Sequence, residues 1–255
     1  MNVYIPSSYD GQTPVPLVIM LHGYTSSAAD HEAYMRFSPL AQARGFLYCY
    51  PDGTIDILGD HFWNATDACC DFYNSGVDDA DYLRALIEEI GSQFSVDRKR
   101  IQVIGHSNGG FMAYRMACQS ADLIAGIASL AGTTFLDPSR CQPSEPVHIL
   151  QIHGSADDSY LGDAFQPGAL QSVQFWAGYN GVADPIADPV LSMNLDLAVP
   201  GLDTVITRYT NAPPGGAVEL WTINGGGHEP TFYSGSSASE FAPRVIDWLL
   251  THPKP

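Results

Sequence analysis

Residues 100–110 read RIQVIGHSNGG, and FMAYRMACQ follows at 111–119. The apolar run at 100–104 predicts a buried strand, and 108–119 is typical of a helix. Between them, GHSNG at 105–109 matches the pattern G-x-S-x-G, in which a serine sits on a strained strand-to-helix turn whose close neighbours must lack a Cβ. The serine oxygen then stands clear of the sheet at a helix N-terminus, where backbone N–H groups stabilise an oxyanion. The segment therefore predicts a nucleophilic serine, Ser107.

The rest of the chain alternates between strands and helices. Short apolar runs predict strands at 15–21, 45–50, 123–130, 147–152, 203–210 and 217–223, and 2–6 reads like the middle of another. Helical spacing of apolar residues predicts helices at 79–94, 168–179 and 241–250. This order implies right-handed crossovers and a mostly parallel sheet with helices on both faces. Residues 184–201 follow no period, and we expect a surface excursion near the site. No repeat or linker divides the chain, so we assign one α/β domain over residues 1–255.

An oxyanion hole needs two N–H donors. The residue after the nucleophile, Asn108, supplies one. The second is expected from the loop after an earlier strand, and LHGYT at 21–25 fits because Gly23 lets the backbone turn towards a substrate. We predict the Tyr24 N–H as this donor. Thr25 and His106 adjoin the two turns and are expected to contact substrate.

A serine hydroxyl needs a base, and the base needs a carboxylate that orients it. In an α/β arrangement of this kind the chain order is serine, acid, histidine. Asp157 and Asp158 both follow the strand at 147–152; spacing favours Asp157, and Asp163 is a weaker candidate. Among eight histidines, His228 follows a strand and the flexible GGG at 225–227 and precedes the last helix, so we predict it as the base.

The composition excludes several classes of partner. A net charge of −17, from 28 acidic and 11 basic side chains spread along the chain, repels nucleic acid and anionic membranes. No apolar stretch approaches the ~18 residues of a membrane span. We therefore expect no nucleic-acid or membrane partner. The cysteines lack zinc-ligand spacing, and we expect no metal or organic cofactor.

Five cysteines bear on the compartment. Cys49 lies in an apolar strand and is expected to be a buried free thiol, whereas the other four lie in loops or at helix ends and suit one or two disulfides of open connectivity (Cys69, Cys70, Cys118 and Cys141). This favours an oxidising compartment. The start of the chain lacks a basic, then apolar, leader, so we interpret it as a mature or trimmed secreted protein.

With these residues identified, the chain resembles the polyhydroxybutyrate depolymerase/feruloyl esterase-like family of secreted hydrolases, the carbohydrate esterase family 1 type within the α/β-hydrolase superfamily. The likeness runs through the Leu-His-Gly turn and the following motifs: PDG at 51–53, WN at 63–64, CC at 69–70, VDD at 77–79, GHSNGG at 105–110, IHG at 152–154 and GGH at 226–228. It implies the α/β-hydrolase fold, the triad Ser107, Asp157 and His228, and disulfides among the four cysteines. It also implies Trp63 as a candidate wall of the acyl or aromatic pocket, whereas Trp176, in a helix, is expected to be core.

Two departures from the family pattern affect substrate contacts. The family usually has Trp-Pro shortly after the histidine, where this chain has EPTF at 229–232. It also often has a cysteine where this chain has GV at 181–182. We predict a monomeric, secreted carboxylic-ester hydrolase that forms an acyl-enzyme on feruloyl or other aryl esters or on polyesters. The alternatives are an acyltransferase or peptidase with the same triad, and a non-catalytic interaction module.

Overall fold

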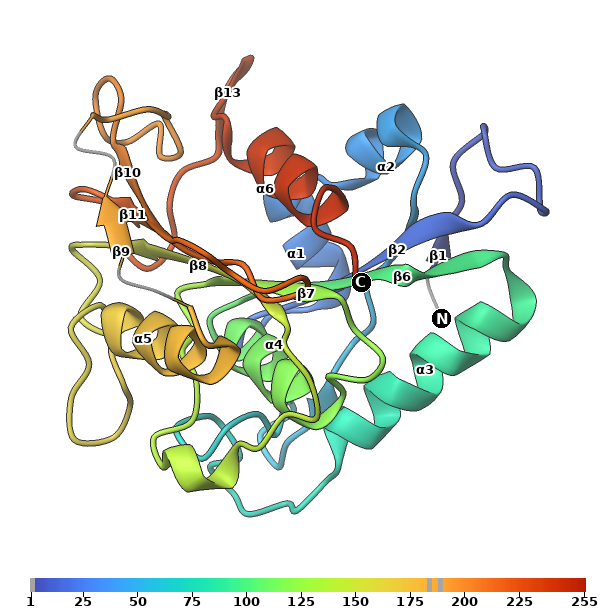
Figure 1. Ribbon diagram of the computed structural model, residues 1–255, viewed down its shortest axis with the longest axis horizontal. Helices are drawn as coiled ribbons and strands as arrows, with labels where there is room; N and C mark the ends of the chain where they lie inside the picture. The colour runs from blue at the N-terminus through green and yellow to red at the C-terminus, as the bar shows by residue number, and fades with distance from the viewer. Residues whose placement is uncertain (1–2, 183–184, 188–189) are drawn as a thin grey trace.

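The core of the fold is one nine-stranded sheet. The computed structural model describes residues 3–182, 185–187 and 190–255. Its strand order is β1-β3-β2-β6-β7-β8-β11-β10-β9 (Figure 1). The strands are β1 Val3–Tyr4, β2 Val15–Leu21, β3 Leu47–Cys49, β6 Val96–His106, β7 Gly126–Leu130, β8 His148–Gly154, β9 Pro185–Ala187, β10 Thr204–Tyr209 and β11 Val218–Ile223. The run from β3 to β11 is parallel, whereas the pairs β1–β3, β11–β10 and β10–β9 are antiparallel, which confirms the mostly parallel sheet.

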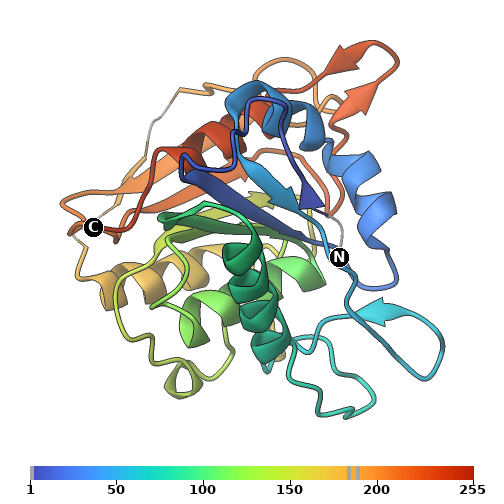
Figure 2. The ribbon, with the colours of Figure 1, turned by 90° about the vertical axis from the view of Figure 1, so that its right-hand side faces the viewer.

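Helices cover both faces of this sheet. They are α1 Ala28–Met35, α2 Ser38–Arg44, α3 Asp79–Gln93, α4 Asn108–Gln119, α5 Ala169–Asn180 and α6 Phe241–Leu250. In Figure 1, α1, α2 and α6 lie above the sheet and α3, α4 and α5 below it; Figure 2 shows the same layers from the side. Two short hairpins, β4 Thr54–Ile55 with β5 His61–Phe62 and β12 Tyr233–Ser234 with β13 Ser237–Ala238, stand outside the sheet.

The sheet separates two hydrophobic layers. Side chains alternate along a strand, so β2 places Leu17 and Ile19 in the layer with α3, α4 and α5, and Val18 and Met20 in the layer with α1, α2 and α6. Both faces of β2 are therefore buried, which explains why its sequence is a continuous apolar run. None of the helices in the described residues is both long enough and apolar enough to cross a membrane.

Most predicted elements are present with shifted ends, but the sequence did not indicate α1 or α2. In α1 only Ala28, His31 and Met35 are buried, so the helix has no continuous apolar stripe. The α2 helix is short and has a proline in its first turn. Of the predicted strand at 2–6, Asn2 lies outside the described residues, and β1 pairs antiparallel with β3 at the sheet edge.

The structure contains two disulfides, Cys69–Cys70 and Cys118–Cys141, and Cys49 is buried and free. The second disulfide joins the last turn of α4 to the loop before β8. The first joins neighbours in the loop between β5 and α3, near the candidate site.

Candidate active site

Ser107 occupies the turn between β6 and α4. Its backbone has φ 52° and ψ −121°, a conformation that is strained for any residue with a side chain. The turn closes because two neighbours are glycines: a Cβ on Gly105 would overlap the Gly109 carbonyl, and a Cβ on Gly109 would overlap the Leu21 carbonyl. Fixed in this way, the Ser107 side chain projects from the carboxyl end of the central strand.

The three predicted triad residues form one hydrogen-bonded chain. His228 Nε2 lies 2.9 Å from Ser107 Oγ, and His228 Nδ1 lies 2.7 Å from Asp157 Oδ2. Asp157 follows β8, and His228 follows β11 in the loop before α6. Because β6, β8 and β11 are parallel, their carboxyl ends share one edge of the sheet, where residues far apart in sequence meet.

Asp157 is the acid that contacts His228, and its environment keeps it charged. Burial alone would raise its pKa, but hydrogen bonds from His153, His228 and Ser159 outweigh burial and hold the pKa of this carboxyl well below its usual range. The alternatives lie elsewhere. Asp158 lines the cleft without contacting His228, and Asp163 accepts backbone N–H groups within its own loop.

Two further histidines support the triad. His153, fully buried, lies with Nε2 3.1 Å from Asp157 Oδ2. His106 has Nε2 2.9 Å from the His228 carbonyl oxygen, which can only accept, so this nitrogen carries the proton. Burial lowers the pKa of His106 to about 4, so the ring is neutral near pH 7. The sequence indicated a substrate contact for His106, and only the fold reveals the partners of both histidines.

The two predicted oxyanion donors lie beside Ser107: Tyr24 lines the polar lobe of the cleft, and Asn108 follows Ser107 at the start of α4. Among the described residues, neither the Tyr24 N–H nor the Asn108 N–H donates to a protein group. The Gly23 carbonyl accepts from His22 Nδ1 (2.8 Å) and from the Ser26 N–H (3.2 Å). In a trans peptide the N–H points opposite to the C=O, so the Tyr24 N–H points away from His22. Gly23 itself packs on Ser107, since a Cβ there would lie 3.6 Å from Ser107 Cβ.

The cleft has two lobes, and both contain Ser107 and His228. The polar lobe, about 440 Å³, is lined mainly by hydroxyl, imidazole and carboxylate groups, including those of Tyr24, Thr25, Asp30, His31, Tyr34, His106 and Glu229. The apolar lobe, about 340 Å³, is lined by Cys69, Phe72, Phe111, Ala131 and Phe165, with Asp158 and Gln166 on the same wall. Thr25 and His106 thus lie where substrate contact was expected, whereas sequence reasoning missed Tyr34, Phe72 and Phe165.

One expectation about the cleft is wrong. Trp63 is not a pocket wall: its side chain is fully buried and lines neither lobe. The excursion expected near the site at 184–201 does lie near it where it is described; residues 184, 188 and 189 lie outside the described residues. It adds β9 to the sheet edge and packs on the loop after His228, with the Leu197 N–H 2.8 Å from the Thr231 carbonyl. Trp176 is core, as expected.

No cluster of three or more metal-ligating side chains occurs in the part of the chain that the structure describes. The hydrogen bond to Asp157 raises the pKa of His228, although burial opposes this, and the nearby Glu229 carboxylate raises it further.

Comparison with known proteins places these features in a family. Residues 18–244 match the alpha/beta hydrolase family. Feruloyl esterase B of Piromyces equi is 31% identical over 240 residues, which are 89% of this chain and 42% of that protein. Poly(3-hydroxyalkanoate) depolymerase C of Paucimonas lemoignei is 26% identical over 218 residues, 83% of this chain and 48% of that protein.

This chain therefore spans less than half the length of those two relatives. Among solved structures, an acetyl xylan esterase from Aspergillus awamori superposes with a TM-score of 0.69 at 16% identity, covering 97% of this chain and 92% of that one. That likeness shows a shared fold over nearly the whole chain. From the family match over residues 18–244 and the sheet described above, the chain belongs to the alpha/beta hydrolase family.

Proposed function

We propose that this protein hydrolyses carboxylic esters through an acyl-enzyme on Ser107. The observation that carries the proposal is the continuous hydrogen-bonded chain from Ser107 Oγ through both nitrogens of His228 to Asp157. A neutral imidazole between a hydroxyl and a charged carboxylate can take the hydroxyl proton and is stabilised as it becomes a cation.

The reaction then proceeds in two halves. Ser107 Oγ attacks the ester carbonyl while His228 Nε2 accepts its proton, and the Tyr24 and Asn108 N–H groups bind the oxyanion of the tetrahedral intermediate. The same nitrogen returns the proton to the departing alcohol oxygen, leaving an acyl group on Ser107. Water, activated by His228, attacks this acyl group and releases the acid. Every proton in this cycle is handled by protein groups and water.

The two lobes support a substrate with two unlike halves. The phenyl rings of Phe72, Phe111 and Phe165 suit an aromatic or apolar group. The hydroxyls and carboxylates of Tyr24, Thr25, Asp30 and Glu229 suit a group rich in hydroxyls. We infer that the preferred substrate is an ester between an aryl acid and a polyhydroxy alcohol, such as a feruloyl ester. Polyester chains remain the second candidate, because a relative is named as a polyhydroxyalkanoate depolymerase.

Hydrolysis is favoured over acyl transfer because water reaches the base: the His228 side chain is 44% exposed. Comparing a p-nitrophenyl ester with a peptide anilide, with and without an added alcohol acceptor, separates the three reactions. We also infer that the chain works in an oxidising compartment outside the cell, which the two disulfides support, and that it acts as a monomer.

The proposal is tested with methyl ferulate, acetylated xylan, polyhydroxybutyrate and an aromatic polyester as substrates. The unaltered chain should turn over methyl ferulate fastest. Ser107→Ala should lose about 10³-fold or more of kcat. Ser92→Ala also removes one hydroxyl, which hydrogen-bonds within α3, and it should leave kcat unchanged. Turnover by Ser107→Ala at the unaltered rate would refute the proposal. Faster turnover of polyhydroxybutyrate than of methyl ferulate would identify a polyester as the preferred substrate.

A further inference from the structure

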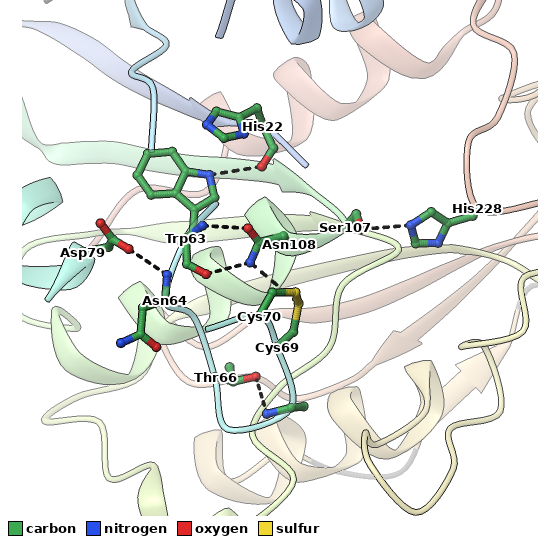
Figure 3. The surroundings of a disulfide bond; sticks show 11 residues. His22, Trp63, Asn64, Thr66, Cys69, Cys70, Asp79, Ser107, Asn108 and His228 are labelled. Atoms are coloured by element: carbon green, nitrogen blue, oxygen red, sulfur yellow. Dashed lines mark hydrogen bonds between the residues drawn. A yellow bond between two sulfur atoms is a disulfide. The ribbon is translucent and has the colours of Figure 1, made fainter. Parts of the chain in front are cut away.

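Trp63 lies between the two segments that carry the proposed oxyanion donors, although it touches neither cleft lobe. Figure 3 shows its indole pointing to the His22 carbonyl and its backbone facing the side chain of Asn108. It follows β5 in the loop that leads to the Cys69–Cys70 disulfide. The positions of these three residues suggest a task for Trp63 other than filling the core.

On one side, Trp63 holds the segment with the Tyr24 N–H. Its Nε1–H donates to the His22 carbonyl at 3.1 Å, and the indole and imidazole ring centres lie 5.0 Å apart. His22 Nε2 accepts from the Gly53 N–H at 2.9 Å, which leaves the proton on Nδ1 for the Gly23 carbonyl. Anchoring both the carbonyl and the ring of His22 therefore sets the plane of the peptide that presents the Tyr24 N–H.

On the other side, Trp63 is tied to Asn108 by a reciprocal pair of hydrogen bonds. The Trp63 N–H donates to Asn108 Oδ1 at 2.7 Å, and Asn108 Nδ2 donates to the Trp63 carbonyl at 2.9 Å. Both side chains are fully buried. Asn108 Nδ2 also lies 3.7 Å from Cys69 Sγ, so the disulfide loop shares this anchor. The Asn108 side chain thus fixes the first residue of α4, whose N–H is the other proposed donor.

We propose that Trp63 is a positioning residue that sets the spacing of the two oxyanion donors, Tyr24 N–H and Asn108 N–H. The proposal rests on the proposed ester hydrolysis. Oxyanion stabilisation needs donors about 2.7–3.1 Å from the oxygen as it becomes charged. Small errors in such geometry are costly: a misplacement of about 1 Å can reduce turnover about 10²-fold. A residue that bridges the two donor segments should therefore affect the transition state more than substrate binding.

The chain offers a matched control for ordinary core packing. Trp176 is also fully buried, and its Nε1–H also donates at 3.1 Å, but to Thr134 Oγ1 in the loop after β7; neither residue lines a lobe. Phenylalanine at either position removes one indole N–H and a similar volume. For Trp63→Phe we expect kcat on methyl ferulate to fall about tenfold or more with KM within about twofold, since one anchoring hydrogen bond is lost. Trp176→Phe should change kcat less than about twofold, even where its Tm falls equally.

A second readout reports on the oxyanion hole directly. An aryl trifluoromethyl ketone adds to the serine and places an oxyanion in the hole, whereas an ether analogue of the substrate has no carbonyl. Trp63→Phe should weaken binding of the ketone in proportion to its loss of kcat/KM and leave binding of the ether unchanged. Asn108→Ala, which keeps both N–H donors but removes the other link, should behave in the same way. If Trp63→Phe does not fold, Asn108→Ala is used for the same measurements.

The outcomes separate the two proposals. If the unaltered chain lacks ester turnover, the proposed function fails. If it is active, two results would make Trp63 only a packing residue and overturn this inference. One is that Trp63→Phe and Asn108→Ala lose no more kcat than Trp176→Phe. The other is that they weaken binding of the ether as much as binding of the ketone.

Discussion

The strained backbone of Ser107 and the raised pKa of His228 both favour proton transfer between these two residues. His228 must be neutral to accept the Ser107 proton, and the hydrogen bond to Asp157 raises its pKa above the ordinary 6.5. In the free enzyme, kcat/KM should therefore rise with pH through a midpoint above 6.5.

Glu229→Gln removes a carboxylate that favours the protonated imidazole, so the acid-side midpoint should move to lower pH. The pH profile of kcat/KM measures this shift. Glu88→Gln removes an exposed carboxylate of α3 that pairs with Arg98 and lines neither lobe, so it is the control and should leave the midpoint in place. A midpoint that moves to higher pH in Glu229→Gln would contradict this account of His228.

Asp157 should matter through orientation as well as charge. Asp157→Asn presents either an amide N–H or a neutral oxygen to His228, which disturbs its tautomer, and we expect kcat to fall about 10³–10⁴-fold. Asp158→Asn is the matched control, because Asp158 lines the cleft without touching His228. Steady-state kinetics on both variants decides the matter; equal losses would mean that the acid has been misassigned.

The sequence indicates some of these residues better than others. Ser107, Asp157 and His228 are readable because each follows a buried strand, and parallel strands bring their ends together. Trp63 was misread because its loop has no apolar period, and its burial depends on the partner of its indole, His22, and the partner of its backbone, Asn108. Those hydrogen bonds join residues about 40 positions apart and leave no local pattern.

At the scale of elements, the cleft walls come from segments that sequence periodicity described poorly. Helix α1 contributes His31 and Tyr34 to the polar lobe, and the loop before α5 contributes Phe165 to the apolar lobe. By contrast, α3, α4 and α6 were predicted nearly to their ends, because each has a continuous apolar face that packs on the sheet. The scaffold is thus more predictable than the loops that select a substrate.

The Cys118–Cys141 disulfide closes a loop of 23 residues that contains β7. Replacing both cysteines by alanine should lower the free energy of unfolding by about 2–4 kcal/mol, because the unfolded chain gains freedom. Urea unfolding of the oxidised proteins measures this, and adding reductant to the unaltered protein supplies a second comparison. An unchanged unfolding midpoint would mean that the link contributes nothing to stability.

At the scale of the whole molecule, the acidic surface dominates. A net charge of −17 produces self-repulsion at neutral pH, whereas the surface ion pairs, such as Arg44–Asp247 and Arg84–Asp122, are each worth little. Raising NaCl from about 0.01 M to about 0.15 M shortens the screening length from about 30 Å to about 8 Å. We therefore expect Tm at pH 7 to rise with salt over this range.

The acidic isoelectric point gives this prediction its internal control. At pH 5, close to the isoelectric point of about 4.5, the net charge is small and the same salt step should change Tm much less. Differential scanning calorimetry at both pH values measures the effect. A salt response at pH 5 equal to that at pH 7 would show that net repulsion is not its cause.

The most direct test of the account is to isolate the covalent intermediate. A slowly hydrolysed aryl ester is mixed with the protein, the reaction is quenched in acid within its first turnover, and the digested chain is examined by mass spectrometry. We predict an aryl-acyl group on Ser107, absent from Ser107→Ala, that disappears at the rate of turnover. Turnover without an adduct at position 107, or an adduct on another residue that forms and decays at that rate, would contradict catalysis through an acyl group on Ser107.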